Sequence, residues 1–155
     1  MAASKAKQRL SFVHTHTNET LSTVYRVGGH YVPKSLGQIR SLLRDFRTGD
    51  AHDIDPLLLD WLHELAVVTG TNEPFFIISG YRSPRTNSML RKRSAHSGVA
   101  EKSMHLQGKA IDIRLPDVKL ADLRDAALSM KLGGVGYYPG SNFVHVDTGR
   151  VRHWS

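Results

Sequence analysis

Apolar residues recur at intervals of three and four along several stretches of the chain, a spacing that predicts amphipathic helices. An acid followed by proline at Asp55-Pro56 is typical of a helix start, and glycines end three of the periodic stretches. The predicted helices run from after Pro33 to Gly49, with Phe46 on the apolar face, from Asp55-Pro56 to Gly70, around Thr86–Arg93, and over Leu120–Met130.

Other stretches alternate between apolar and polar residues or are short and continuously apolar, which predicts β-strands. The predicted strands are Leu10–Thr17, Leu21–Val27, His30–Val32, Phe75–Ser79, Lys109–Leu115, Val135–Tyr138, Phe143–Asp147 and Val151–Trp154. Short turns join most of these strands. We therefore expect an α+β fold in which an antiparallel sheet carries the functional site and the helices pack on one side.

The length of 155 residues is enough for one domain with a full hydrophobic core. We expect residues 1–9 to be a flexible N-terminal extension and residues 10–155 to form a single domain. The absence of cysteine excludes a disulfide scaffold, a thiol nucleophile and a thiolate zinc site. No stretch approaches the length of an apolar membrane span, and the basic N-terminus lacks the apolar core of an export leader.

Basic residues outnumber acidic ones by 21 to 14, so the formal net charge is +7. Between Arg82 and Lys109, seven basic residues stand against one acid, Glu101, so most of the excess lies in this segment. A basic surface favours an anionic partner, namely nucleic acid, anionic lipid or an acidic polymer. A solvated helix face explains the run Arg91-Lys92-Arg93 equally well.

Two late strands each place an ionisable residue opposite an aliphatic face. Asp112 alternates with isoleucines, and His145 alternates with valines. If these strands are neighbours, Asp112 and His145 converge, and Gly108 lets the chain turn so that His105 joins them. Two imidazoles and a carboxylate with a fourth position for water make a catalytic zinc site. The alternative is a loop histidine, a surface aspartate and a histidine satisfied within the sheet.

The sequence motifs around these residues resemble those of a known superfamily. Ser79-Gly80-Tyr81-Arg82-Ser83 precedes Ser103-Met104-His105, then Gly108-Lys109-Ala110-Ile111-Asp112, and finally the strand histidine of Phe143-Val144-His145. This order resembles the D-Ala-D-Ala metallopeptidases, a superfamily that includes lysostaphin-type enzymes and hedgehog domains. Within it, the chain is most similar to the branch of MepK-like murein endopeptidases.

The resemblance implies a zinc metallopeptidase domain over residues 10–155 that hydrolyses peptide bridges of bacterial peptidoglycan, with one Zn²⁺ per chain. It assigns His105, Asp112 and His145 as zinc ligands and Arg82 as the group that stabilises the carbonyl or oxyanion. Candidate substrate-binding residues are Ser103, Tyr138 and His96. The expected partners are peptidoglycan peptides rather than nucleic acid, with the oligomeric state left open. Such a substrate implies a periplasmic or cell-envelope location.

One position departs from the superfamily pattern. Where many members carry a glutamate or histidine base shortly before the last zinc histidine, this chain has Asn142 and Phe143, and neither accepts a proton. Asp147 lies on the same strand face as His145. It is a candidate general base or, alternatively, a group that orients a metal ligand.

Three functional hypotheses follow. The first is a murein endopeptidase, with carboxypeptidase trimming as a variant. The second is a zinc-binding module of the same fold that binds the cell wall without hydrolysis, which the missing base supports. The third is a nucleic-acid-binding protein or metal nuclease. Only the net charge suggests it, and the chain has no recognition-helix motif that would support it.

Overall fold

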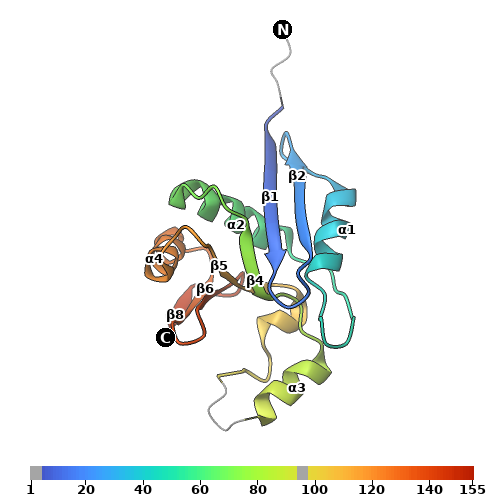
Figure 1. The fold of residues 1–155 in the computed structure, drawn as a ribbon, viewed down its shortest axis with the longest axis vertical. Coiled ribbons are helices and arrows are strands. Elements are labelled where there is room, and N and C mark those ends of the chain that lie inside the picture. The colour runs from blue at the N-terminus through green and yellow to red at the C-terminus, as the bar shows by residue number, and fades with distance from the viewer. Residues whose placement is uncertain (1–4, 94–97) are drawn as a thin grey trace.

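One eight-stranded sheet organises the fold, and the order of its strands is β3-β2-β1-β4-β5-β7-β6-β8 (Figure 1). The structure is a computed structural model, and it describes residues 5–93 and 98–155. The strands are β1 (Lys7–His14), β2 (Thr20–Val27), β3 (His30–Tyr31), β4 (Phe75–Ser79), β5 (Ala110–Arg114), β6 (Gly134–Tyr138), β7 (Phe143–Asp147) and β8 (Arg152–Trp154). Two neighbouring pairs, β1 with β4 and β6 with β8, are parallel, and the others are antiparallel.

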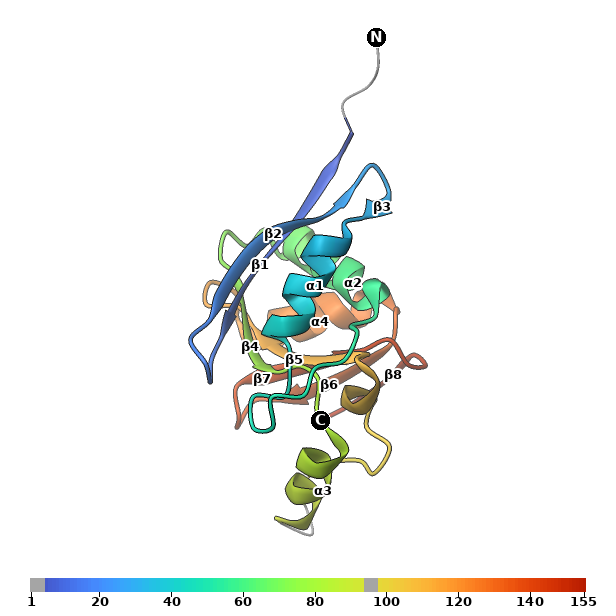
Figure 2. The same ribbon diagram turned by 90° about the vertical axis from the view of Figure 1, so that its right-hand side faces the viewer.

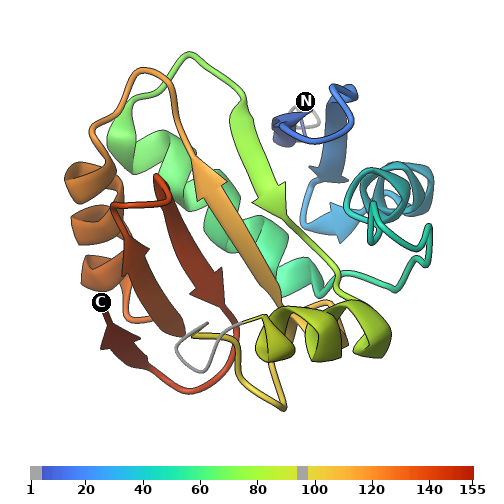
Figure 3. The ribbon, with the colours of Figure 1, turned by 60° about the horizontal axis from the view of Figure 1, so that its bottom comes forward.

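Helices α1 (Pro33–Leu42), α2 (Pro56–Thr69) and α4 (Leu120–Met130) cover one face of this sheet (Figure 2). The fold also has α3 (Pro84–Lys92) and a short 3₁₀ helix η1 (Met104–Gln107). Helices α1, α2 and α4 lie together on one side, whereas α3 projects beyond the end of the sheet (Figures 2 and 3). This confirms the α+β class, although the sheet is mostly rather than wholly antiparallel. In the described part of the chain, none of the helices has the length and apolar character that a bilayer span requires.

The hydrophobic core lies between the sheet and these helices. Ile111 and Ile113 of β5 and Val144 and Val146 of β7 are fully buried in one cluster with the apolar face of α2. Because strand residues alternate between faces, Asp112 and His145 point to the opposite side of the sheet. The core therefore fixes the strands while the other face remains available for chemistry.

The first predicted strand and the first predicted helix were wrong at their boundaries, and the strand ends at His14 and not at Thr17. The first strand starts at Lys7, so Lys7–Arg9 pair with β2 instead of belonging to an extension. Helix α1 ends at Leu42 and not near Gly49. It stops because the Asp45 carboxylate accepts hydrogen bonds from the backbone N–H groups of Arg47 and Thr48, which folds this segment into a turn.

Candidate active site

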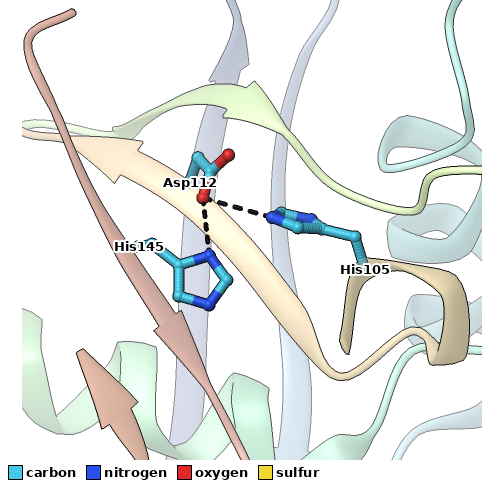
Figure 4. Close-up of side chains that lie close together, drawn as sticks. All are labelled: His105, Asp112 and His145. Atoms are coloured by element: carbon cyan, nitrogen blue, oxygen red, sulfur yellow. Dashed lines mark hydrogen bonds and ion pairs between the residues drawn. The ribbon is translucent and has the colours of Figure 1, made fainter. Parts of the chain in front are cut away.

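Strand pairing brings Asp112 and His145 side by side. Strands β5 and β7 are antiparallel neighbours in the sheet, and in their register Asp112 lies directly opposite His145. Directly opposed residues on one face of a sheet have adjacent side chains. The expected convergence of these two residues is therefore present (Figure 4).

The third member, His105, comes from the 3₁₀ helix that precedes β5. The Ser103 hydroxyl caps this helix by accepting a hydrogen bond from the His105 backbone N–H at 3.2 Å. Gly108 ends it in the left-handed conformation, with φ of +67°. A Cβ atom at Gly108 would lie 2.0 Å from the Asp53 carbonyl oxygen, so only glycine fits this close turn.

The rings of His105 and His145 both approach the Asp112 carboxylate. Asp112 Oδ1 lies 3.2 Å from His105 Nε2 and 2.9 Å from His145 Nδ1, as the dashed lines in Figure 4 show. One ligand atom from each residue lies within 4.8 Å of the other two, and all three residues are buried. This arrangement is a cluster that could hold a metal ion.

The hydrogen bonding of His105 tests whether a cation fits. His105 Nδ1 lies 2.8 Å from the Gly80 carbonyl oxygen, which can only accept, so this nitrogen carries the proton. In the neutral ring Nε2 then has a lone pair directed at a carboxylate oxygen. Burial lowers the pKa of His105 and opposes protonation, although Asp112 raises it. Two facing acceptors need a cation between them, and the donor set suits a divalent metal.

Asp147 holds the other side of His145. Its Oδ2 lies 2.7 Å from His145 Nε2, and Arg152 donates to both carboxylate oxygens at 2.9 Å. Gly149 N–H also donates to Oδ1 at 3.0 Å, and the side chain is completely buried. Burial alone would raise the pKa of Asp147, but the bonds from His145 and Arg152 outweigh it and lower that pKa.

His145 thus lies between two carboxylates. Burial lowers its pKa, but hydrogen bonds to Asp112 and Asp147 outweigh this effect and raise the pKa of His145 to about 9. A carboxylate on the ring nitrogen that faces away from a metal position is the usual way in which proteins orient a ligating histidine. The geometry is therefore that of an orienting contact between Asp147 and Nε2.

Arg82 reaches the same site from the segment between β4 and α3. Its Nη2 lies 4.0 Å from Asp112 Oδ2, and its Nη1 donates to Asn87 Oδ1 at 3.2 Å. Nε is buried, with no hydrogen-bond partner among the described residues. Burial lowers the pKa of Arg82 and nearby Asp112 raises it, but a guanidinium remains charged. A charged donor with unused N–H groups therefore faces the cluster.

The cluster opens into a cavity of about 180 Å³. Two predicted substrate-binding residues, Ser103 and Tyr138, line this cavity together with Lys102, Phe143 and Trp154. His96 lies outside the described residues. Asn142 and Phe143, shortly before His145, supply no proton acceptor, and the Phe143 ring stacks on Tyr138 with centroids 4.6 Å apart.

Sequence reasoning missed two residues of strand β8. The sequence patterns assign no role in the site to Arg152, and they give Trp154 only as the end of the last predicted strand. Alternation along the strand puts both on the face opposite His153, which was an available signal. The parallel pairing of β8 with β6, which brings that face to the cavity, is set by tertiary structure.

Comparison with known proteins identifies the family. The family model described as peptidoglycan L,D-endopeptidase MepK matches residues 2–154. The chain is 46% identical over 145 residues to peptidoglycan L,D-endopeptidase MepK of Escherichia coli K12, covering 94% of this chain and 79% of that protein. It is also 41% identical over 155 residues to the probable peptidoglycan L,D-endopeptidase MepK of Haemophilus influenzae, covering 99% and 82%.

Comparison with solved structures gives no significant match. The sequence matches nevertheless span most of the chain, and they confirm the resemblance seen in its motifs. The buried His-Asp-His cluster is consistent with a peptidase family that uses a metal. The chain therefore belongs to the peptidase family described as peptidoglycan L,D-endopeptidase MepK.

Proposed function

We propose that this protein hydrolyses peptide bonds in peptidoglycan crosslinks, acts as an L,D-endopeptidase like its named relatives, and works in the cell envelope. The observation that carries the proposal is the meeting of His105, Asp112 and His145 with Arg82 at one cavity. Together they provide a set of metal ligands and a fixed positive charge at the same place.

His105 Nε2, Asp112 Oδ1 and His145 Nδ1 would hold one zinc ion. Two imidazoles and a carboxylate leave a coordination position open, as in catalytic rather than structural zinc sites. When bound, zinc lowers the pKa of water and polarises the carbonyl that is attacked. The Gly80 carbonyl keeps the His105 ring in the tautomer that presents Nε2 to the cluster.

Arg82 and Asp147 support the reaction in different ways. The unused N–H groups of Arg82 would donate to the substrate carbonyl oxygen as it gains negative charge. Asp147 would orient His145, because both of its oxygens are already engaged by His145, Arg152 and Gly149. Of the two roles expected for Asp147, this geometry favours the orienting role over that of general base.

The surroundings of the cavity suit an acidic peptide. Ser103 and Tyr138 offer hydroxyl groups at its wall, and Lys102 adds a positive charge. Peptidoglycan stem peptides carry carboxylates, so the excess of basic residues between Arg82 and Lys109 would draw them toward the site.

Digestion of purified peptidoglycan tests this function. Zinc-loaded protein is incubated with crosslinked muropeptides, and the products are separated and identified by mass. We expect cleavage of crosslinks at an L,D bond, loss of cleavage with a chelator, and recovery on adding zinc. His145→Ala is the matched inactive control, and the expected zinc content is one ion per chain. Cleavage of crosslinks by the chelated protein, or no cleavage by the zinc-loaded protein, would contradict the proposal.

A second candidate is a wall-binding module that keeps zinc without hydrolysis. The observation in its favour is the absence of a proton acceptor at Asn142 and Phe143. The same digestion separates the two functions, because a binding module would take up zinc and sediment with peptidoglycan without releasing products.

A further inference from the structure

The Tyr138 hydroxyl at the cavity wall is held by a tryptophan near the C-terminus. Trp154 Nε1 lies 2.7 Å from the Tyr138 hydroxyl oxygen. An indole nitrogen only donates, so the tyrosine oxygen is the acceptor in this bond. The hydroxyl proton of Tyr138 is therefore directed elsewhere, and among the described residues this hydroxyl has no other hydrogen-bond partner.

Several features of the fold fix this pair in place. In the parallel pairing of β6 and β8, Trp154 lies opposite Gly136. A Cβ atom at Gly136 would be 2.6 Å from the indole ring, so the glycine makes room for the tryptophan over the sheet. On its other side the Tyr138 ring stacks on Phe143 with centroids 4.6 Å apart. Both the position and the orientation of the hydroxyl are thus determined by neighbouring rings.

This pair belongs to the same cavity as the metal cluster. Tyr138 and Trp154 line the cavity together with His105, Asp112 and His145. The Trp154 ring also contacts His145, with centroids 5.1 Å apart. A hydroxyl with a free proton, oriented at the wall of a peptide-binding cavity, is a donor for an acceptor oxygen of the ligand.

We propose that Tyr138 donates a hydrogen bond to an oxygen of the bound peptide and that Trp154 is the positioning residue that aims this hydroxyl. The inference rests on the proposed peptidase function and extends it to the C-terminal strand. Strand β8 then has two roles at the site, because Arg152 holds the Asp147 carboxylate and Trp154 holds the Tyr138 hydroxyl.

Three single variants test the substrate contact by the kcat/KM for a crosslinked muropeptide. Tyr138→Phe removes only the hydroxyl, and we expect a loss of roughly tenfold, the effect of one hydrogen bond. Trp154→Phe keeps an aromatic ring without the donor, and we expect a smaller loss of roughly three- to fivefold. Tyr137→Phe is the matched control, because Tyr137 lies on the other face of β6 beneath Arg124, and its kcat/KM should match wild type.

The double variant Tyr138→Phe/Trp154→Phe separates positioning from packing. If Trp154 acts through the Tyr138 hydroxyl, removing the indole from a protein that lacks this hydroxyl costs nothing further. We therefore expect the double variant to equal Tyr138→Phe within about twofold. Zinc content is measured for each variant, because Trp154 also contacts His145. Additive losses, or an unchanged kcat/KM in Tyr138→Phe, would overturn the proposal.

The indole proton resonances report the contact without any activity measurement. The chain has two tryptophans, and the indole nitrogen of Trp61 is buried, with no hydrogen-bond partner among the described residues. The signal missing from Trp154→Phe belongs to Trp154. In Tyr138→Phe this signal should move to higher field while the Trp61 signal stays, and Tyr137→Phe should move neither. An unmoved Trp154 signal in Tyr138→Phe would contradict the positioning role.

These readouts distinguish a failure of the proposed function from a failure of the positioning role of Trp154. Wild-type protein that binds zinc but releases no product overturns the proposed function, together with the contact to substrate. Wild-type activity with an unmoved indole signal or additive losses overturns only the role of Trp154.

Discussion

At the scale of single residues, Arg82 shows how burial and charge combine at the candidate site. Its side chain is 10% exposed, yet only one described hydrogen bond, to Asn87, occupies its guanidinium. Burying a cation with unused donors costs free energy, and such a cost is typical of positions kept for a ligand. The remaining N–H groups are those that we assign to the substrate oxygen.

Replacing Arg82 tests this assignment. We expect Arg82→Ala to lower turnover on the order of 10²–10³-fold, the usual effect of losing an oxyanion donor. Arg82→Lys keeps the charge but loses the planar fork, so it should restore turnover only in part. Zinc content should stay at the wild-type level in both. Arg85→Ala, which removes an exposed basic residue, is the control, and normal turnover per folded molecule in Arg82→Ala would exclude the role.

Replacing Asp147 tests the orientation of His145. In Asp147→Asn an amide nitrogen replaces one carboxylate oxygen, and this nitrogen cannot accept the hydrogen bonds that His145 and Arg152 make to Oδ2. We expect zinc affinity to weaken about 10–100-fold, as for other groups that orient a ligating histidine. Titration with a competing chelator measures this, with Asp125→Asn as an exposed control. Normal zinc affinity with turnover reduced by roughly 10²–10⁴ would instead indicate a general base.

At the scale of elements, short connections place the functional side chains. Helix η1 and Gly108 present His105, and the turn after α1 holds the segment that carries Arg82. In that turn Asp45 Oδ2 accepts a hydrogen bond from the Ser83 backbone N–H at 2.9 Å, just where α3 begins. The site therefore depends on contacts between segments that have little regular structure of their own.

Gly108→Ala should disturb the site more than an equivalent change elsewhere. Gly70 has the same φ of +67°, but a Cβ atom added there would meet nothing within 4 Å, so Gly70→Ala measures the conformational cost alone. We expect that control to lose about 1–2 kcal/mol of unfolding free energy. Gly108→Ala should lose more and should also bind zinc more weakly, because the clash with Asp53 shifts η1. Equal losses of stability and unchanged zinc binding would contradict this.

Asp45 should make the turn sensitive to acid. Burial alone would raise the pKa of Asp45, but hydrogen bonds from Thr86, Ser83 and Arg47 outweigh it and lower that pKa below its ordinary value of 3.8. The folded state therefore binds this proton less readily than the unfolded state. Its stabilising contribution is complete above the ordinary pKa and disappears as the pH falls through the lower native value.

Asp45→Asn measures that contribution. We expect the metal-free variant to lose about 1–3 kcal/mol of unfolding free energy at pH 7, since a charged hydrogen-bond acceptor is removed. The difference from wild type should shrink at pH 3. Denaturant titrations at both pH values give the two numbers, and a difference that is constant or grows on acidification would contradict the prediction.

At the scale of the whole molecule, the core and the candidate site occupy opposite faces of the same strands. Ile111, Ile113, Val144 and Val146 bury one face of β5 and β7, while Asp112 and His145 occupy the other. The core therefore does not need the metal to form. We therefore expect that an ion bound at the candidate site can be removed without loss of the fold.

Metal removal should accordingly abolish activity and leave the structure folded. We expect chelated protein to keep its circular dichroism and a cooperative thermal transition at a lower Tm, because zinc binds the folded state and stabilises it by mass action. Added zinc should restore both the Tm and peptidoglycan cleavage. Loss of the cooperative transition on chelation would show instead that the ion is structural.

The sequence by itself determined the fold class, most of the strands and helices, and the three residues of the buried cluster that could hold a metal ion. Apolar periodicity is a local property, so the sequence alone predicts the elements. The order and spacing of the motifs predict that His105, Asp112 and His145 lie close together if β5 and β7 are neighbouring strands, as they are. Tertiary structure alone decided the early end of α1, the engagement of both Asp147 oxygens, and the arrival of Arg152 and Trp154 at the cavity. Each of these depends on contacts between distant segments, such as the parallel pairing of β8 with β6, and local sequence patterns do not encode such pairing.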